Sequence, residues 1–285
     1  MLLKDIVGQS GIKKALQINI DACKMSSKPL PHSLFYGFAG GGKTTFANAI
    51  AVEMGGEFQE ANGAALSSVK SILPFLMRIK ENSVLFIDEI HSCGKKVLDY
   101  LLTAMEQFKV TVGDTTHPIP KFTLIGATTN PGLLIKPLRD RFVLKYSIQP
   151  YSNKEMLKIV TDCCQRLTPM AAEVLVRASK NVPRIAKNYL TLINNYAIVN
   201  GKTVITDQYV LICLELMGVR ADGLDKDDLE YLRLLKQIQP AGITTLAAST
   251  GFSRDQIENL IEPYLLTKGV IKRTPKGRVL IENKN

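Results

Sequence analysis

The chain has 285 residues, 46% of them hydrophobic, and a formal net charge of +10, which predicts two or three folded domains and excludes a disordered chain. It contains no run of about 18 apolar residues, and its start, MLLKDIVGQS, turns polar too soon for a secretory signal, so neither a membrane span nor export is expected. The five scattered cysteines form no C-x-x-C pair, which indicates neither a zinc site nor a disulfide framework and fits a cytoplasmic protein.

The first motif is a glycine-rich turn between a strand and a helix. Residues 34–36 predict a buried strand, and residues 45–54 predict a helix that Gly55-Gly56 ends. The turn at 37–44, GFAGGGKT, matches G-x-x-x-x-G-K-[ST], in which backbone N–H groups and a helix N-terminus bind phosphates. A chance glycine-rich turn is the alternative, which the flanking strand and helix disfavour. The predicted ligands are ATP and Mg²⁺, and the candidate residues are Gly37, Gly40, Gly41, Gly42, Lys43, Thr44 and Thr45.

In this arrangement Lys43 reaches the β- and γ-phosphates, and Thr44 offers its hydroxyl to Mg²⁺. A second apolar run at 84–87 predicts a central strand, with Asp88 and Glu89 at its carboxyl end. We expect Asp88 to hold Mg²⁺ through water and Glu89 to act as general base on the attacking water. The alternative is a solvated acidic turn.

A third strand is predicted at 122–127, and it ends in polar residues that include Thr129. At a strand end beside the acidic pair, such side chains are candidates to contact the γ-phosphate or to position water. His91 follows the acidic pair, as a switch or merely as the start of a helix, and receives no role. Together these segments predict an α/β P-loop ATPase core with a parallel sheet over residues 1–150.

The pattern changes at residue 151. Residues 151–218 have helical periodicity throughout and predict an all-α lid domain. Residues 219–228 are polar and read as a linker. Residues 219–285 predict a short helix, a turn, a second helix opened by Ser253, and a hairpin around Pro275-Lys276-Gly277, which together are typical of a winged-helix domain.

The predicted hairpin is strongly basic. Residues 268–278 carry five basic side chains and no acidic one. This pattern suits contacts with the phosphate backbone without reading of bases, and it favours duplex DNA over a protein partner. The candidate DNA-binding residues are Lys272, Arg273, Lys276 and Arg278.

Several motifs occur in the order found in the RuvB family of AAA+ ATPases: IVGQ at 6–9, LFIDEIH at 85–91, FTLIGATT at 122–129, PRIA at 183–186 and KRTPKGR at 272–278. The chain resembles this family over nearly its whole length. The resemblance implies an AAA+ core, a helical lid and a winged helix. It also implies a ring, usually a hexamer, that hydrolyses ATP on duplex DNA and drives branch migration at four-way (Holliday) junctions in recombination and repair.

The resemblance also implies roles for single residues. Ile6 and Val7 match the segment against the adenine, and Tyr151 matches a tyrosine near the base. Lys43, Thr44, Asp88 and Glu89 match the P-loop and Walker B positions. Thr129 matches the first sensor and Arg184 the second, a lid arginine that touches the phosphates of its own subunit. Arg141 matches the arginine finger that enters the neighbouring subunit's ATP site. The alternative, which needs no function, is a surface ion pair of Arg141 with Asp140 or another acid.

Residues 107–121 are shorter than the family's hairpin that docks the junction-binding adaptor RuvA, so a RuvA-like partner is expected less firmly than the ATPase and the wing. The alternative function is that of an AAA+ winged-helix initiator or loader. Such a protein uses ATP as a DNA-binding switch with slow turnover, whereas intact Glu89 and Arg141 favour sustained turnover.

Overall fold

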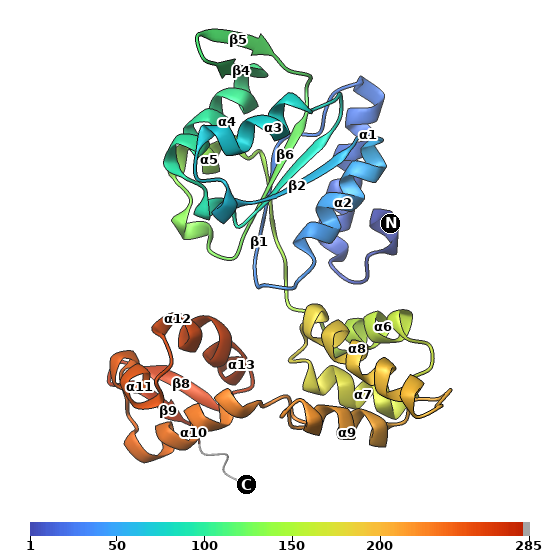
Figure 1. Ribbon diagram of the computed structural model, residues 1–285, viewed down its shortest axis with the longest axis vertical. Coiled ribbons are helices and arrows are strands. Elements are labelled where there is room, and N and C mark those ends of the chain that lie inside the picture. The colour runs from blue at the N-terminus through green and yellow to red at the C-terminus, as the bar shows by residue number, and fades with distance from the viewer. Residues whose placement is uncertain (282–285) are drawn as a thin grey trace. The chain divides into compact units, whose positions relative to one another are not determined.

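A computed structural model describes residues 1–281, and the last four residues of the expected 219–285 domain lie outside this range. The chain divides into two compact units, Met1–Glu155 and the part from Met156 onward (Figure 1). Among the described residues, no helix is both long and apolar enough to cross a lipid bilayer.

The first unit is built on a five-stranded parallel sheet with strand order β2-β3-β6-β1-β7. The three strands predicted from the sequence are its centre, and two flanking strands complete it. The strands are β1 (Ser33–Tyr36), β2 (Phe58–Asn62), β3 (Val84–Asp88), β6 (Thr123–Thr128) and β7 (Leu144–Ser147).

Helices cover both faces of this sheet (Figure 1). One face carries α1 and α2, and the other carries α3, α4 and α5. Short 3-10 turns join several of these elements. The helices are α1 (Ser10–Ser26), α2 (Lys43–Met54), α3 (Val69–Met77), α4 (Lys95–Gln107) and α5 (Lys136–Arg141).

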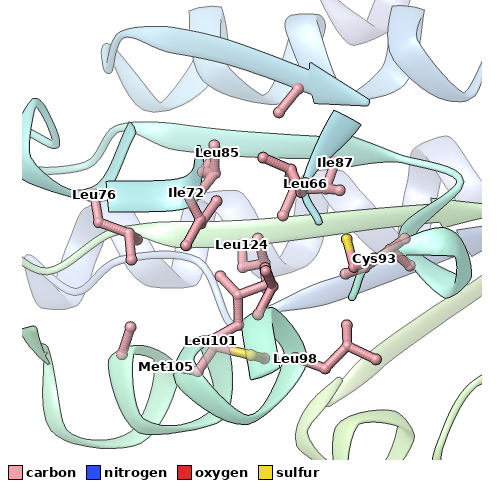
Figure 2. Close-up of a cluster of buried hydrophobic side chains, with 14 of the residues drawn as sticks. Leu66, Ile72, Leu76, Leu85, Ile87, Cys93, Leu98, Leu101, Met105 and Leu124 are labelled. Atoms are coloured by element: carbon pink, nitrogen blue, oxygen red, sulfur yellow. The ribbon is translucent and has the colours of Figure 1, made fainter. Parts of the chain in front are cut away.

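The central strands are apolar on both faces because both faces are covered. In β3, Leu85 points toward α3 and α4, whereas Phe86 packs with α2 on the opposite side. Figure 2 shows the first of these cores, where Leu101 and Met105 of α4 lie below Leu124 of β6. The two cores fix the strand ends, and therefore the loops that carry the candidate site.

A short antiparallel hairpin projects from the first unit (Figure 1). It pairs β4 (Lys109–Val112) with β5 (Thr115–Pro118), which confirms the short hairpin expected in this segment. Val110 is buried, whereas the rest of the two strands is exposed. The Tyr100 hydroxyl of α4 donates to the carbonyl of Thr111 at 2.5 Å and ties the hairpin to the core.

The second unit begins inside the first of the expected helices, and the others follow it. Thr168 caps α7 by accepting a hydrogen bond from the N–H of Ala171, and Pro169 opens that helix. Gly201 and Gly218 follow α8 and α9 with left-handed φ values, as helix-ending glycines do. The helices are α6 (Asn153–Cys163), α7 (Pro169–Ala178), α8 (Pro183–Val199) and α9 (Asp207–Leu216).

The remaining elements form the winged helix. Ser253 accepts a hydrogen bond from the N–H of Gln256 and caps α12, as predicted, and the helix continues through one π-helical turn, Ile257–Ile261. The elements are α10 (Lys226–Ile238), α11 (Ile243–Thr250), α12 (Arg254–Gln256), α13 (Glu262–Thr267), β8 (Ile271–Thr274) and β9 (Gly277–Leu280).

The polar segment 219–228 differs from the linker expected. Its last residues, Lys226–Asp228, already belong to α10, with Asp225 as the N-cap. Asp225 and Asp228 exchange side-chain and backbone hydrogen bonds in a capping box. The segment is folded because these carboxylates accept hydrogen bonds from the backbone N–H groups at the start of α10.

Candidate active site

The predicted phosphate-binding loop joins β1 to α2. Gly37, Gly40 and Gly42 have φ values of 136°, 77° and 98°, a region that residues with a Cβ rarely adopt. Lys43, the first residue of α2, is 7% exposed. Its ammonium group donates to the carbonyl oxygens of Gly37 and Phe38 at 2.9 and 3.1 Å. The lysine charge is therefore held inside the loop at a helix N-terminus, the arrangement that attracts phosphate.

The phosphate-binding loop is closely packed against the residues that follow β7. A Cβ on Gly41 would lie 2.9 Å from Cγ2 of Ile148 and 3.0 Å from Cζ of Phe38. The buried Tyr151 donates its hydroxyl to the carbonyl of Gly41 at 2.9 Å. Burial raises the pKa of Tyr151, so the hydroxyl stays protonated at neutral pH. Tyr151, expected near the base, thus also fixes the backbone of the phosphate-binding loop.

The N-terminal segment meets the end of the sheet beside this tyrosine. Ile6 is buried and Val7 is partly buried. The amide of Gln9 donates to the carbonyl of Gln149 at 2.6 Å and accepts from its N–H at 3.2 Å. These paired hydrogen bonds bring together the two segments that carry Ile6 and Val7 and Tyr151, which were predicted separately to contact the nucleotide.

The parallel register places the motif-bearing strand ends on one edge. Tyr36 of β1 is opposite Thr128 of β6, and Ile87 of β3 is opposite Gly126. The phosphate-binding loop, the acidic pair and the polar end of β6 therefore follow one another along the carboxyl edge, where ligands bind in such sheets. Thr44 and Thr45 lie in the first turn of α2, partly buried and exposed respectively.

Glu89 has an unusual backbone and a well-defined side chain. Its φ and ψ are 45° and 50°, the left-handed region, and its N–H donates to Oδ1 of Asp88 at 3.1 Å. Its Oε2 accepts hydrogen bonds from the backbone N–H and the hydroxyl of Thr129, at 3.0 and 3.1 Å. Non-glycine residues in this region are uncommon and cluster at functional sites. Glu89 and Thr129, 40 residues apart in sequence, thus contact each other directly.

His91 joins the same group of side chains. Its Nδ1 lies 2.8 Å from Oγ1 of Thr128 and 3.2 Å from Oε2 of Glu89. The sequence alone predicts no role for His91. The only signal available there was its position two residues after Glu89.

Arg141, the last residue of α5, meets a negative charge on its own chain. Its guanidinium group pairs with Glu106 of α4, and the two side chains are 45% and 42% exposed. The buried Phe142 beside it anchors the end of α5. Because exposed ion pairs contribute only about 0–1 kcal/mol, this pair exchanges readily for a stronger partner. Within its own chain, the acid that Arg141 pairs with is therefore Glu106, and its role toward a neighbouring subunit stays a prediction.

Arg184 belongs to the second unit. It lies in the first turn of α8, directly after Pro183, and its side chain is exposed. The proline at the first helical position orients this turn.

The four candidate DNA-binding residues of the wing separate into two kinds. Lys272 and Lys276 are exposed. Arg273 and Arg278 instead bind the fully buried carboxylate of Glu262 in α13, at distances of 2.5–2.9 Å, and Arg278 also reaches Glu258 at 3.1 Å. The wing therefore offers its lysines to solvent, whereas its arginines also hold it against α13.

Glu262 is ionised despite its burial. Burial alone would raise its pKa, but hydrogen bonds from Arg278, Tyr231 and Arg273 hold the pKa of Glu262 below its ordinary value. The Tyr231 hydroxyl donates at 2.8 Å from α10. Glu258 and Glu262 were missed in the sequence, although their four-residue spacing on one helix face is a readable signal.

Comparison with known proteins matches both ends of the chain. Residues 1–148 match the family model of the Holliday junction DNA helicase RuvB P-loop domain, and residues 221–283 match that of the RuvB C-terminal winged-helix domain. Holliday junction branch migration complex subunit RuvB of Rickettsia africae is 38% identical over 98% of this chain and 86% of its own length. The subunit of the same name from Lactobacillus johnsonii is 40% identical over 97% of this chain and 86% of its own length.

Among solved structures, the Thermotoga maritima RuvB Holliday junction branch migration motor matches with a TM-score of 0.87 and 34% identity. The match covers 99% of this chain and 94% of that one. On the shared P-loop core, the shared winged helix and this full-length similarity, the chain belongs to the RuvB family of AAA+ ATPases.

Proposed function

We propose that the chain is an ATP-hydrolysing motor that assembles into a ring on duplex DNA and drives branch migration at Holliday junctions. The observation that carries the proposal is the direct contact between Glu89 and Thr129 at the sheet edge that also holds the phosphate-binding loop. A general base and a γ-phosphate sensor in contact support sustained hydrolysis rather than passive nucleotide binding. The names of the relatives supply the junction as substrate.

In the proposed reaction, the P-loop N–H groups and Lys43 bind the phosphates of ATP. Glu89 accepts a proton from water as the water oxygen attacks the γ-phosphorus, and the bond to the ADP oxygen breaks. Thr129 contacts the γ-phosphate from β6, and Arg184 contacts the phosphates from the lid. Arg141 of a neighbouring subunit neutralises the charge that develops on the leaving group, which couples hydrolysis to assembly.

Mg²⁺ fits the chemistry of this site. Thr44 and Asp88 offer oxygen donors, which this hard cation prefers, and it normally completes its shell with water and phosphate oxygens. Among residues 1–281 no cluster of three or more His, Cys, Asp or Glu side chains offers a cage for another metal. When bound, Mg²⁺ neutralises phosphate charge during transfer.

On DNA, we assign the phosphate contacts to the wing, through Lys272 and Lys276 and the exposed part of Arg273. Tracking of the backbone by charge alone is independent of sequence, as a translocating motor requires. The hairpin β4–β5 is the proposed docking surface for a RuvA-like adaptor. Its short, polar strands predict weaker docking than a long apolar hairpin gives.

The mass of the assembly on duplex DNA, with Mg²⁺ and a slowly hydrolysed ATP analogue, tests the ring, together with steady-state ATPase rates. A wild-type ring of about six subunits, with ATP turnover lost in Arg141→Ala, is expected. Arg139→Ala, in which the neighbouring arginine of α5 is changed, is the matched control and should keep turnover. A single turnover followed by release from DNA would instead identify an ATP-gated switch of the loader type.

The catalytic assignment is tested separately. Lys43→Ala should abolish ATP-dependent activity, because the phosphates lose their main cation. Glu89→Gln should still bind ATP but not hydrolyse it, because an amide cannot accept the proton. Normal turnover in either variant would overturn the assignment.

A further inference from the structure

Three polar groups converge on a single oxygen of Glu89. Oε2 receives the backbone N–H of Thr129 at 3.0 Å and its hydroxyl at 3.1 Å, and Nδ1 of His91 lies 3.2 Å away. The same Nδ1 lies 2.8 Å from Oγ1 of Thr128. The other carboxylate oxygen, Oε1, takes no part in these contacts. The carboxylate is therefore oriented through one oxygen while the second remains for proton transfer.

The contacts identify which ring nitrogen of His91 carries the proton. If Nδ1 were bare, its lone pair would face the carboxylate oxygen of Glu89, which is a repulsive arrangement. With a proton on Nδ1, the ring donates toward both Oε2 of Glu89 and Oγ1 of Thr128. Thr128 Oγ1 also accepts from the N–H of Asn130 at 3.0 Å, so this hydroxyl serves as an acceptor on both sides. The geometry thus assigns the Nδ1–H tautomer, with His91 as donor to the base.

The backbone of Glu89 has little room to adjust on the side of the neighbouring turn. Its conformation is left-handed, and it packs so closely against this turn that a Cβ on Gly63 would lie 2.2 Å from the carbonyl oxygen of Glu89. With the backbone fixed, the direction of the carboxylate depends on its side-chain partners. Among the hydrogen bonds and ion pairs of the described residues, Thr129, directly after β6, and His91 supply them.

The hydroxyl of Thr129 has one proton to donate. In the proposed reaction this hydroxyl donates its proton to the γ-phosphate. Its hydrogen bond to Glu89 is therefore broken when ATP is bound. Two donors then remain on Oε2, the N–H of Thr129 and Nδ1–H of His91. Among the described residues, His91 is then the side chain that still donates to the base as the attacking water arrives.

We propose that His91 is a positioning residue for Glu89: it keeps the general base aligned with the attacking water when the γ-phosphate takes over the Thr129 hydroxyl. This inference rests on the proposed roles of Glu89 and Thr129. Loss of alignment by about 1 Å can reduce a rate by roughly 100-fold, so a large effect on kcat is expected from a residue that does not touch the substrate. Binding of ATP does not depend on His91.

The test uses steady-state ATPase kinetics of the full chain on duplex DNA with Mg²⁺. His91→Ala should lower kcat on the order of 10- to 100-fold with little change in KM for ATP, since only alignment is lost. His91→Asn places an amide N–H near the position of Nδ1 and should restore most of the rate. His91→Gln is the matched control, because its amide reaches the position of Nε2 instead and should not restore it.

Failure of the inference is distinguishable from failure of the proposed function. If Glu89→Gln hydrolyses ATP normally, the assignment of the base is wrong and the inference falls with it. If Glu89→Gln is inactive but His91→Ala keeps its kcat, the inference alone is wrong. The inference is also wrong if His91→Asn and His91→Gln lose kcat equally while both still bind a slowly hydrolysed ATP analogue. In that case the role of His91 is steric, because a steric role does not distinguish the two amides.

Discussion

Three charged residues of the candidate site each have a partner within the chain. Lys43 and Glu89 were identifiable from local sequence and Arg141 from the family resemblance, and each has an in-chain partner: loop carbonyls, Thr129 and Glu106. Glu106 lies 35 residues before Arg141, on a different helix, and nothing in the local pattern links them. Recognition of the residue was therefore possible from sequence, whereas recognition of its partner was not.

A buried histidine in the core predicts a dependence of stability on pH. Nδ1 of His32 accepts the N–H of Leu124 at 2.8 Å, and Nε2 lies 3.1 Å from the carbonyl of Met105. Burial lowers the pKa of His32 below its ordinary value of 6.5. The unfolded chain therefore binds a proton that the folded chain resists, so the free energy of unfolding should fall as the pH drops below about 6.5.

Urea denaturation at a series of pH values measures this effect. His32→Gln should flatten the slope just below the ordinary pKa, whereas His117→Gln, which changes an exposed histidine of the hairpin, should leave it unchanged. An unaltered slope in His32→Gln would contradict the assignment.

At the scale of elements, the wing combines two tasks on one short hairpin. Its lysines are exposed and its arginines hold Glu262, so we expect DNA affinity and stability to be separable. Lys272→Ala together with Lys276→Ala should weaken binding to any duplex sequence and lower the slope of log K against log salt by about 1.8, or about 0.9 for each phosphate contact. Lys158→Ala, in which a lysine paired with Asp162 is removed, is the control. An unchanged slope in the double variant would mean that DNA binds elsewhere.

The carboxylate beneath the wing should matter for stability instead. Glu262→Ala leaves the 13%-exposed Arg278 without its main partner, and removal of one member of a buried pair costs about 3–5 kcal/mol. Glu258→Ala, four residues earlier, changes an exposed partner of the same arginine and should cost below about 1 kcal/mol. Guanidinium denaturation of the two variants compares them, and equal costs would contradict a structural role for Glu262.

At the scale of the whole molecule, the segment between α7 and α8 connects the lid to the winged helix. Lys180, 11% exposed, places its ammonium 2.5 Å from the buried Asp228 and 3.2 Å from Asp225. Burial opposes the charge of Lys180, but the hydrogen bond to Asp228 prevails and raises the pKa of the lysine. Arg184, the proposed phosphate-contacting residue of the lid, follows four residues later. The supposed linker is therefore tied to the lid through the segment that directly precedes the helix carrying this arginine.

Lys180→Ala should lower the free energy of unfolding by about 3 kcal/mol or more, because Asp228 is left buried without a cation. Its DNA-stimulated ATPase rate should fall as well, since the ion pairs of Lys180 with Asp225 and Asp228 that connect the lid to the winged helix are lost. Arg220→Ala, in which an exposed ion pair with Asp222 is removed nearby, should change either quantity little. A Lys180→Ala variant that keeps both its free energy of unfolding and its DNA-stimulated ATPase rate would refute this connection.

The sequence by itself determined the phosphate-binding loop, the acidic pair, the three central strands, the helical lid and the winged helix. Each of these depends on contiguous residues, because glycine torsions, hydrophobic periodicity and helix caps act over a few positions along the chain. Only the tertiary structure decided that Glu89 meets Thr129 and His91, that Arg141 meets Glu106, and that Arg273 and Arg278 meet Glu262. These pairings join distant segments whose approach is set by strand register and helix packing, and no local pattern of residues encodes that approach.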